Sequence, residues 1–149
     1  MSLQLRSARP GDLPTVLALL ASDVMRSVVE PTEVTDRQRA AFAEILADPA
    51  ADLVVGELGG RLVCTATVNY LRGLSYDGGL ICQIEAVRTV DDLRGQGIGR
   101  ALVASIVETA RERGCARVQL TSNRRRDRAH AFYERLGFTA SHVGFKLEL

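Results

Sequence analysis

The sequence predicts one domain of the α/β class, with a mixed (α+β) sheet that carries helices on both faces. Apolar residues recur at helical spacing in some segments and on alternate positions in others, in the order β-α-α-β-β-β-α-β-α-β. A glycine-rich run, RGQGIGR at residues 94–100, separates the fourth predicted strand from a helix. The 149 residues form most simply a single domain, residues 1–149, which buries roughly 70% of its unfolded surface.

The N-terminal quarter of the chain predicts one strand and two helices. Residues 3–8 alternate in the manner of an edge strand. Residues 10–12, PGD, mark a turn and a helix start, and LPTVLALLAS follows with apolar residues at helical spacing. Asp36 is a suitable N-cap for a second helix over residues 37–48. Residues 24–35 between the helices are predicted to form a loop or a short helix.

Three β-type segments occupy the middle of the chain. The pair Gly59-Gly60 between residues 52–58 and 61–71 is a strong hairpin signal, so these two strands should be antiparallel. The third segment, LICQIEAVRTV at residues 80–90, reads as another strand and leads into the glycine-rich run.

The last third of the chain predicts two helices and two strands. The helix after the glycine-rich run ends at Gly114, a typical C-terminal cap. Residues 115–121 read as a strand, residues 127–136 as a short helix, and the alternating residues 138–149 as a closing strand. Because a helix connects the strands at 80–90 and 115–121, these two should be parallel.

Composition excludes several classes of protein. The net charge of +1 gives no basic field that would favour nucleic acid, and no segment approaches the ~20 apolar residues of a membrane helix. The N-terminus lacks the apolar core of a signal peptide. Cys64, Cys82 and Cys115 form no CxxC pair and have no histidine at metal spacing. We therefore expect reduced thiols, no metal and a cytoplasmic protein.

The glycine-rich run has the chemistry of a phosphate cradle. A helix N-terminus carries unpaired N–H groups and a partial positive charge, and glycine lets an anion approach that backbone closely. Arg94 and Arg100 add guanidinium donors beside it. The spacing fits neither a P-loop, which needs a lysine followed by serine or threonine, nor a dinucleotide fingerprint. A turn without a ligand is the alternative.

Two motifs resemble the GCN5-related N-acetyltransferase (GNAT) family, whose members bind acetyl-coenzyme A (acetyl-CoA). Residues 94–99, RGQGIG, match its Arg/Gln-x-x-Gly-x-Gly/Ala signature, and IEAVRTVDDLRGQGIGRAL is similar to its strand and pyrophosphate loop. Downstream, AHAFYERLGF is similar to its A-x-x-F-Y-x-x-x-G-F segment. These motifs cover residues 84–138. The resemblance implies a GNAT-type acyl-CoA N-acyltransferase fold with the fourth and fifth strands parallel and splayed.

The resemblance also implies where the cofactor lies. The pyrophosphate would rest on the backbone of the glycine-rich loop, and the pantetheine arm would pair with the fourth strand after a bulge. The thioester carbonyl would accept a hydrogen bond from backbone near Val87. Asn123 would bind the pantetheine arm, although a loop asparagine that satisfies backbone groups is the alternative. The expected cofactor-binding residues are Ala86, Val87, Thr89, Arg94, Gly95, Gln96, Gly97, Ile98, Gly99, Arg100 and Asn123.

Two side chains are the candidates for acid–base catalysis. By resemblance Tyr133 is the acid that protonates the departing thiolate, since an ordinary tyrosine hydroxyl with a pKa near ~10 is protonated at neutral pH. Glu85 is the candidate base that takes a proton from the attacking amine, directly or through water. The alternatives are an amphipathic core tyrosine and a solvent-facing glutamate.

The predicted function is transfer of acetyl from acetyl-CoA to a primary amine, of a small molecule, by direct attack in a ternary complex. The alternatives are a non-catalytic acyl-CoA-binding module and an acetyltransferase of protein amines; a nucleic-acid binder using RRRDR at 124–128 fits the charge and the few aromatics poorly. The acceptor is expected at residues 23–36, at the turn 71–79 and at the end of the last strand. Glu30, Glu33 and Asp77 are the acids that would attract an amine there. A homodimer is possible, but no residue pattern predicts one.

Overall fold

A computed structural model describes residues 1–23 and 33–149 of the chain. It divides into two compact units, Met1–Gln119 and Leu120–Leu149. The loop or short helix expected at residues 24–35, and Glu30 within it, lie largely outside the described residues. The strands are β1 (Gln4–Ser7), β2 (Ala51–Leu58), β3 (Arg61–Arg72), β4 (Leu80–Thr89) and β5 (Cys115–Leu120). The helices are η1 (Pro10–Asp12), α1 (Leu13–Ala21), α2 (Asp36–Ala47), α3 (Ser75–Gly78), η2 (Asp91–Leu93), α4 (Ile98–Glu112) and α5 (Asp127–Arg135).

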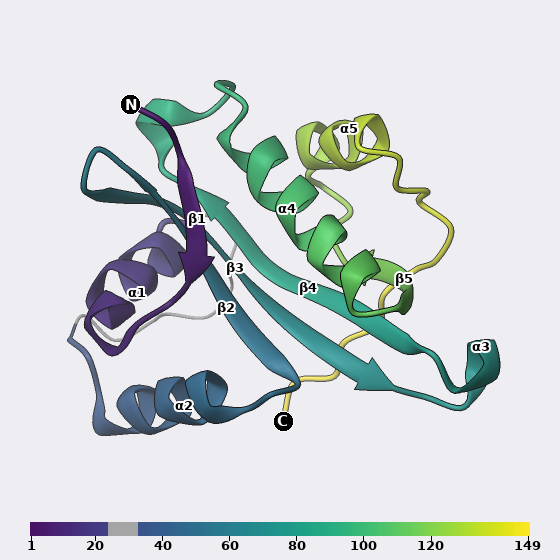
Figure 1. Cartoon of the computed structure of the whole chain (residues 1–149). Helices are drawn as coiled ribbons and strands as arrows, with labels where there is room; N and C mark the ends of the chain where they lie inside the picture. Colours follow the sequence, from purple (N-terminus) through teal and green to yellow (C-terminus); the bar gives the residue numbers. More distant parts are fainter. Residues whose placement is uncertain (24–32) are drawn as a thin grey trace. The chain divides into compact units, whose positions relative to one another are not determined.

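The strands form one mixed sheet in the order β1-β2-β3-β4-β5 (Figure 1). Neighbours from β1 to β4 are antiparallel, and β4 and β5 are parallel. The predicted mixed sheet with parallel strands flanking a helix is therefore confirmed. Gly59 and Gly60 form the β2–β3 turn with φ angles of 58° and 80°, which glycine adopts without steric cost.

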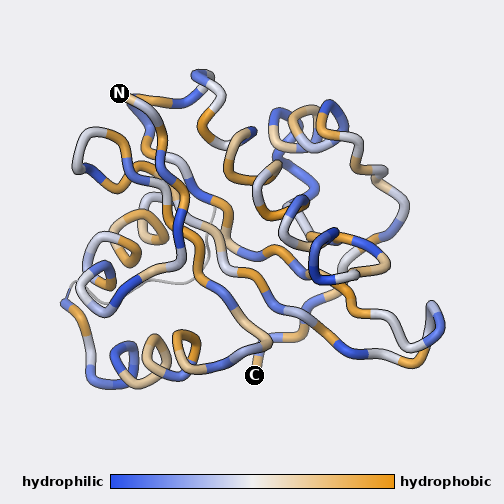
Figure 2. The backbone as a smooth tube through the Cα atoms, in the orientation of Figure 1, coloured by the Kyte–Doolittle hydropathy of each residue, from blue (hydrophilic) through white to orange (hydrophobic). Residues whose placement is uncertain are grey.

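The sheet of the first unit is covered by helices on both faces. Val63, Cys64, Thr65 and Ala66 are consecutive residues of β3 and all are at most 1% exposed. Since successive side chains point to opposite faces of a sheet, a run of this kind needs cover on both sides. Helices α1 and α4 both pack on β3 and β4 and supply it. Figure 2 shows the hydrophobic stretches along these strands and along α1.

Helix α2 begins one residue earlier than the sequence predicts. Thr35, not Asp36, is the N-cap: its side chain accepts from the Gln38 backbone N–H at 3.1 Å, and the Gln38 side chain accepts from the Thr35 N–H at 3.0 Å. This reciprocal capping box satisfies two backbone donors. Asp36 alone would satisfy one, so the predicted cap is wrong by one position.

The predicted closing strand over residues 138–149 is wrong. This segment of the second unit forms no regular secondary structure, and its alternating apolar side chains are exposed, with Val143 at 78% and Phe145 at 93%. Alternation predicts which side chains would share a face, but a strand also requires a neighbour for its backbone hydrogen bonds. The described sheet ends at β5 without this segment.

Candidate active site

Strand β4 contains a bulge at residues 86–87. The register with β3 shifts between Thr65 and Thr67, so two residues of β4 lie opposite one residue of β3. Ala86 has φ 52°, a left-handed conformation that costs an L-residue roughly 1–2 kcal/mol. Strain of this kind is held in place by its surroundings and is concentrated at functional sites. The bulge turns backbone polar groups of β4 out of the ladder with β3.

Strand β5 ends before β4 does. The Gln119 Nε2 donates to Gln83 Oε1 at 2.7 Å, which aligns the two strands, and β5 ends one residue later at Leu120. Strand β4 continues to Thr89. Residues 86–89, which include three of the predicted cofactor-binding positions, therefore extend beyond the ladder with β5. An extended ligand can add to such a backbone as a further strand.

The glycine-rich loop leaves open space at the N-terminus of α4. Gly97 is the N-cap residue with φ 84°, and Gly95 has φ 77°. A Cβ built on either would meet no atom within 4 Å. Ile98, at 7% exposed, anchors the first turn of the helix in the core. The backbone N–H groups of this turn and the helix dipole thus face a space that a diphosphate can enter.

Two aspartates precede the loop and bind arginines. Asp91 Oδ1 lies 2.6 Å from Arg94 Nη2, with both side chains exposed. Asp92 Oδ2 lies 2.8 Å from Arg61 Nη1, and the hydrogen bond from Arg61 lowers the pKa of Asp92. Asp91 therefore pairs with Arg94, one of the two arginines predicted to contact the phosphates, whereas Asp92 pairs with Arg61, which lies outside the predicted cradle.

Replacing Asp91 with asparagine is expected to increase the affinity for coenzyme A by about two- to fivefold, because it releases Arg94 from an exposed ion pair of modest strength. Calorimetric titration at low and high salt measures the change, which should shrink as salt screens the charges. Asp92→Asn is the matched control, since it removes the same charge one residue away. If Asp92→Asn increases the affinity for coenzyme A by the same factor, the effect is due to net charge alone.

Glu85 is exposed and lies on the face of β4 opposite α4. Tyr70 is paired with Cys82, and the Arg113 guanidinium at the end of α4 lies 4.1 Å from the Tyr70 ring centroid, so Cys82 faces α4. Side chains alternate along a strand, which places Gln83 and Glu85 on the other face. The Gln83 Nε2 donates to Glu85 Oε1 at 3.1 Å. The carboxylate is thus reachable from solvent and held by one donor.

The second unit contains two of the predicted residues, Asn123 and Tyr133. Tyr133, on α5, is half-buried, and its ring meets Phe132 and Phe138 edge-on at centroid distances of 5.0 Å and 5.8 Å. Asn123 Oδ1 accepts from the Arg125 backbone N–H at 3.0 Å. This hydrogen bond to a nearby backbone N–H is the alternative role expected for Asn123 from the sequence. It uses the side-chain oxygen and not the NH₂ group.

An ion pair beside the bulge was not predicted. Arg88 Nη2 lies 2.7 Å from Asp23 Oδ2, and the two side chains are 13% and 12% exposed. The partners are 65 residues apart in the chain. No local pattern in a single sequence reports a contact between such distant residues.

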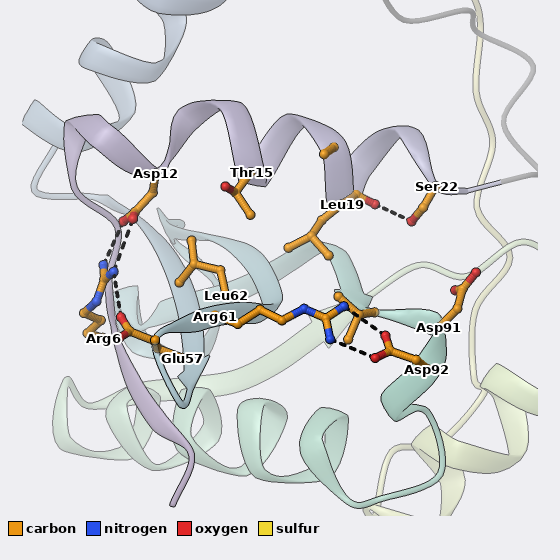
Figure 3. Close-up of a pocket in the computed structure, with 13 residues that line it drawn as sticks. Arg6, Asp12, Thr15, Leu19, Ser22, Glu57, Arg61, Leu62, Asp91 and Asp92 are labelled. Atoms are coloured by element: carbon orange, nitrogen blue, oxygen red, sulfur yellow. Dashed lines mark hydrogen bonds and ion pairs between the residues drawn. The ribbon is translucent and has the colours of Figure 1, made fainter. Parts of the chain in front are cut away.

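A polar pocket of about 720 Å³ lies between α1, the β2–β3 turn and the segment before the glycine-rich loop. Figure 3 shows two groups of paired charged side chains in it: Arg6 contacts Asp12 at 2.7 Å and Glu57 at 3.3 Å, and Arg61 contacts Asp92. The hydrogen bond from Arg6 lowers the pKa of Asp12. None of the predicted cofactor or catalytic residues lines this pocket. The pocket is therefore separate from the candidate site, although Asp91 and Asp92 in its lining directly precede the glycine-rich loop.

The three cysteines are free thiols. Burial raises the pKa of Cys64 and of Cys82 to about 11 in each case, and it also raises the pKa of Cys115. A thiol with a raised pKa is a poor nucleophile at neutral pH because little thiolate is present. Among the described residues, no group of three or more His, Cys, Asp or Glu is arranged to hold a metal ion. Within the same residues no helix has the length and apolarity needed to cross a membrane.

Comparison with known families agrees with this geometry. The family model described as "Acetyltransferase (GNAT) family" matches residues 19–138, which include the bulge, the glycine-rich loop and α5. The chain belongs to the GNAT family and is an acyltransferase.

Two relatives and one solved structure illustrate the similarity. The chain is 29% identical to glucosamine 6-phosphate N-acetyltransferase of Trypanosoma brucei brucei, covering 100% of this chain and 97% of the relative. It is 29% identical to aminoalkylphosphonate N-acetyltransferase of Salmonella typhimurium, covering 95% and 88%. A crystal structure described as a transcriptional regulator from Bacillus halodurans C-125 superposes with a TM-score of 0.95 at 39% identity, covering 99% and 100%.

Proposed function

We propose that the protein transfers the acetyl group of acetyl-CoA to the primary amine of a small molecule in the cytoplasm. The proposal depends most on the segment from β4 to α4. This segment contains the strained bulge at Ala86 and, at the start of α4, the glycine-rich loop in which Gly97 has a positive φ. The cradle offers backbone N–H groups to the pyrophosphate, and residues 86–89 offer an edge to the pantetheine arm. The thioester is thereby held at Val87, where a backbone donor can stabilise the charge that develops on its carbonyl oxygen.

The reaction proceeds by direct attack of the amine on the thioester. The alternative, an acyl-enzyme on cysteine, would need a thiolate, and the raised pKa of Cys64, Cys82 and Cys115 disfavours one. The amine loses a proton, the C–N bond forms and the C–S bond breaks. Glu85 takes the proton, directly or through water, and Tyr133 protonates the departing thiolate.

The acceptor is proposed to carry a phosphate or phosphonate group as well as its amine. Two relatives that span nearly the whole chain are named for glucosamine 6-phosphate and for aminoalkylphosphonate, and both compounds combine an amine with a phosphorus oxyanion. A panel should therefore contain glucosamine 6-phosphate, 2-aminoethylphosphonate and their unphosphorylated counterparts. Release of free coenzyme A thiol, with mass spectrometry of the acetylated amine, measures turnover. Acetyl-CoA binding with no turnover on any amine would favour a non-catalytic module.

Glu85→Gln is expected to lower kcat/KM for the amine by about 10²-fold near neutral pH, the usual contribution of a general base. The deficit should shrink as pH rises, because a primary amine then deprotonates without help. Initial rates between pH 7 and pH 9.5 measure this. Glu44→Gln is the matched control, since Glu44 is exposed on α2 and has no predicted role. A Glu85→Gln enzyme with an unchanged rate at every pH would remove the base from this position.

A further inference from the structure

The guanidinium of Arg88 connects the bulge of β4 to the end of α1. Its Nη1 donates to the backbone carbonyl oxygen of Val87 at 2.8 Å, and its Nη2 donates to Asp23 Oδ2 at 2.7 Å. Both side chains of the ion pair are largely buried, at 13% and 12% exposed. One arginine thus holds a peptide group of β4 and a carboxylate from the segment that follows α1.

This arrangement restrains the backbone that is expected to bind the acetyl group. The Val87 carbonyl belongs to the planar peptide between Val87 and Arg88, so a hydrogen bond that holds this carbonyl restricts ψ of Val87. The Val87 N–H lies in the preceding peptide, and this restriction of ψ limits how the two planes can turn relative to each other. On the other side of Val87 lies Ala86, whose φ of 52° is unfavourable and must be maintained by its surroundings. The Arg88 contact is well placed to keep this bulge in a single conformation.

The burial of the ion pair argues for a role beyond stability. Desolvation makes a buried ion pair weak evidence for stabilisation, since apolar side chains of similar volume often do as well. Here Arg88 also donates to a backbone carbonyl. The ion pair links the residues that follow α1 to β4, on which α1 packs. Its distinctive property is therefore the geometry that it imposes on residues 86–87.

We infer that Arg88, held by Asp23, is a positioning residue that fixes the Val87 backbone donor against the thioester carbonyl of acetyl-CoA. The inference rests on the proposed function for the identity of the bound thioester. Arg88 acts through the Val87 peptide and does not touch the reacting atoms.

The test combines two variants that separate positioning from stability. Arg88→Met leaves the Asp23 carboxylate buried without this partner, so the melting temperature should fall by about 5–15 °C. The double variant Asp23→Leu/Arg88→Met replaces the pair with apolar side chains of similar size and should unfold at a higher temperature than Arg88→Met. Arg6→Met is the control, since it breaks the partly buried Arg6–Asp12 pair away from the bulge.

The main readout is the infrared stretch of the acetyl-CoA carbonyl, labelled with carbon-13, in its complex with each variant. In the parent protein, a hydrogen bond from the Val87 backbone should lower this frequency. In both Arg88 variants the frequency should move back toward that of free acetyl-CoA, and kcat should fall by about 10- to 100-fold with acetyl-CoA KM changed less than about twofold. Arg6→Met should leave the frequency and kcat unchanged.

The outcomes distinguish this inference from the proposed function. A double variant that recovers kcat and the parent frequency together with its melting temperature would show that Arg88 is only structural. A shifted frequency in the Arg88 variants, with no amine acetylated by the parent, would support the positioning role and refute the transfer reaction. Failure of the parent to bind acetyl-CoA would overturn both.

Discussion

Gly97→Val is expected to weaken acetyl-CoA binding by about 10- to 100-fold. Gly97 has φ 84° at the N-cap of α4, and a Cβ there would meet no protein atom within 4 Å. The valine side chain would therefore occupy the open space in front of the helix N-terminus, where the pyrophosphate is proposed to lie. Loss of one charge-assisted hydrogen bond costs about 1.5–3 kcal/mol, so blocking one contact accounts for the whole of this range. Calorimetry and the KM for acetyl-CoA measure the effect.

Gly114→Val is the matched control for the backbone strain. Gly114 follows the other end of α4 with φ 73°, and its Cβ would also meet nothing within 4 Å. Both variants place a β-branched residue in a left-handed conformation, so both should lower the melting temperature by a similar amount, about 3–8 °C. Only Gly97→Val should lose acetyl-CoA affinity. Equal affinities in the two variants would show that the loop does not hold the diphosphate.

The parts of this fold that were predicted correctly are those whose sequence signal lies within the segment itself. The hairpin at Gly59-Gly60 and the end of α4 at Gly114 depend on φ angles that few other residues adopt. Helix α4 has an apolar stripe at helical spacing, and its buried residues follow it. The glycine-rich loop combines both kinds of signal in one segment, which is why its geometry followed from the sequence more closely than that of any other part of the candidate site.

The errors and omissions have non-local causes. The segment 138–149 has the alternation of a strand, yet it forms no strand in the described sheet, because pairing depends on a distant edge and not on alternation alone. Ala86 is an ordinary residue, so its positive φ is imposed by the strands around it and leaves no mark in the sequence. The contact between Asp23 and Arg88 is likewise tertiary, since each is an unremarkable surface residue type when the sequence is read alone.

Tyr133→Phe is expected to lower kcat by about 10²-fold with the KM for acetyl-CoA changed less than about twofold. The thiolate of coenzyme A leaves more readily when it is protonated as the C–S bond breaks, and a positioned acid contributes about 10²–10⁴-fold. Phenylalanine keeps the aromatic ring that meets Phe132 and Phe138 edge-on. The substitution therefore removes the hydroxyl proton while it retains the ring packing of the second unit. Steady-state rates with saturating amine measure the loss.

Tyr70→Phe provides the matched control because it removes a tyrosine hydroxyl elsewhere in the chain. Tyr70 lies on β3 beneath the Arg113 guanidinium, and the substitution keeps its ring and this cation–π contact. Its kcat should stay within about twofold of the parent, and circular dichroism should show both variants folded. If Tyr133→Phe retains the parent kcat, the proton reaches the thiolate from another group or from water. If instead its KM for acetyl-CoA rises while kcat is preserved, the hydroxyl binds the cofactor, because loss of binding common to the ground and transition states appears in KM alone.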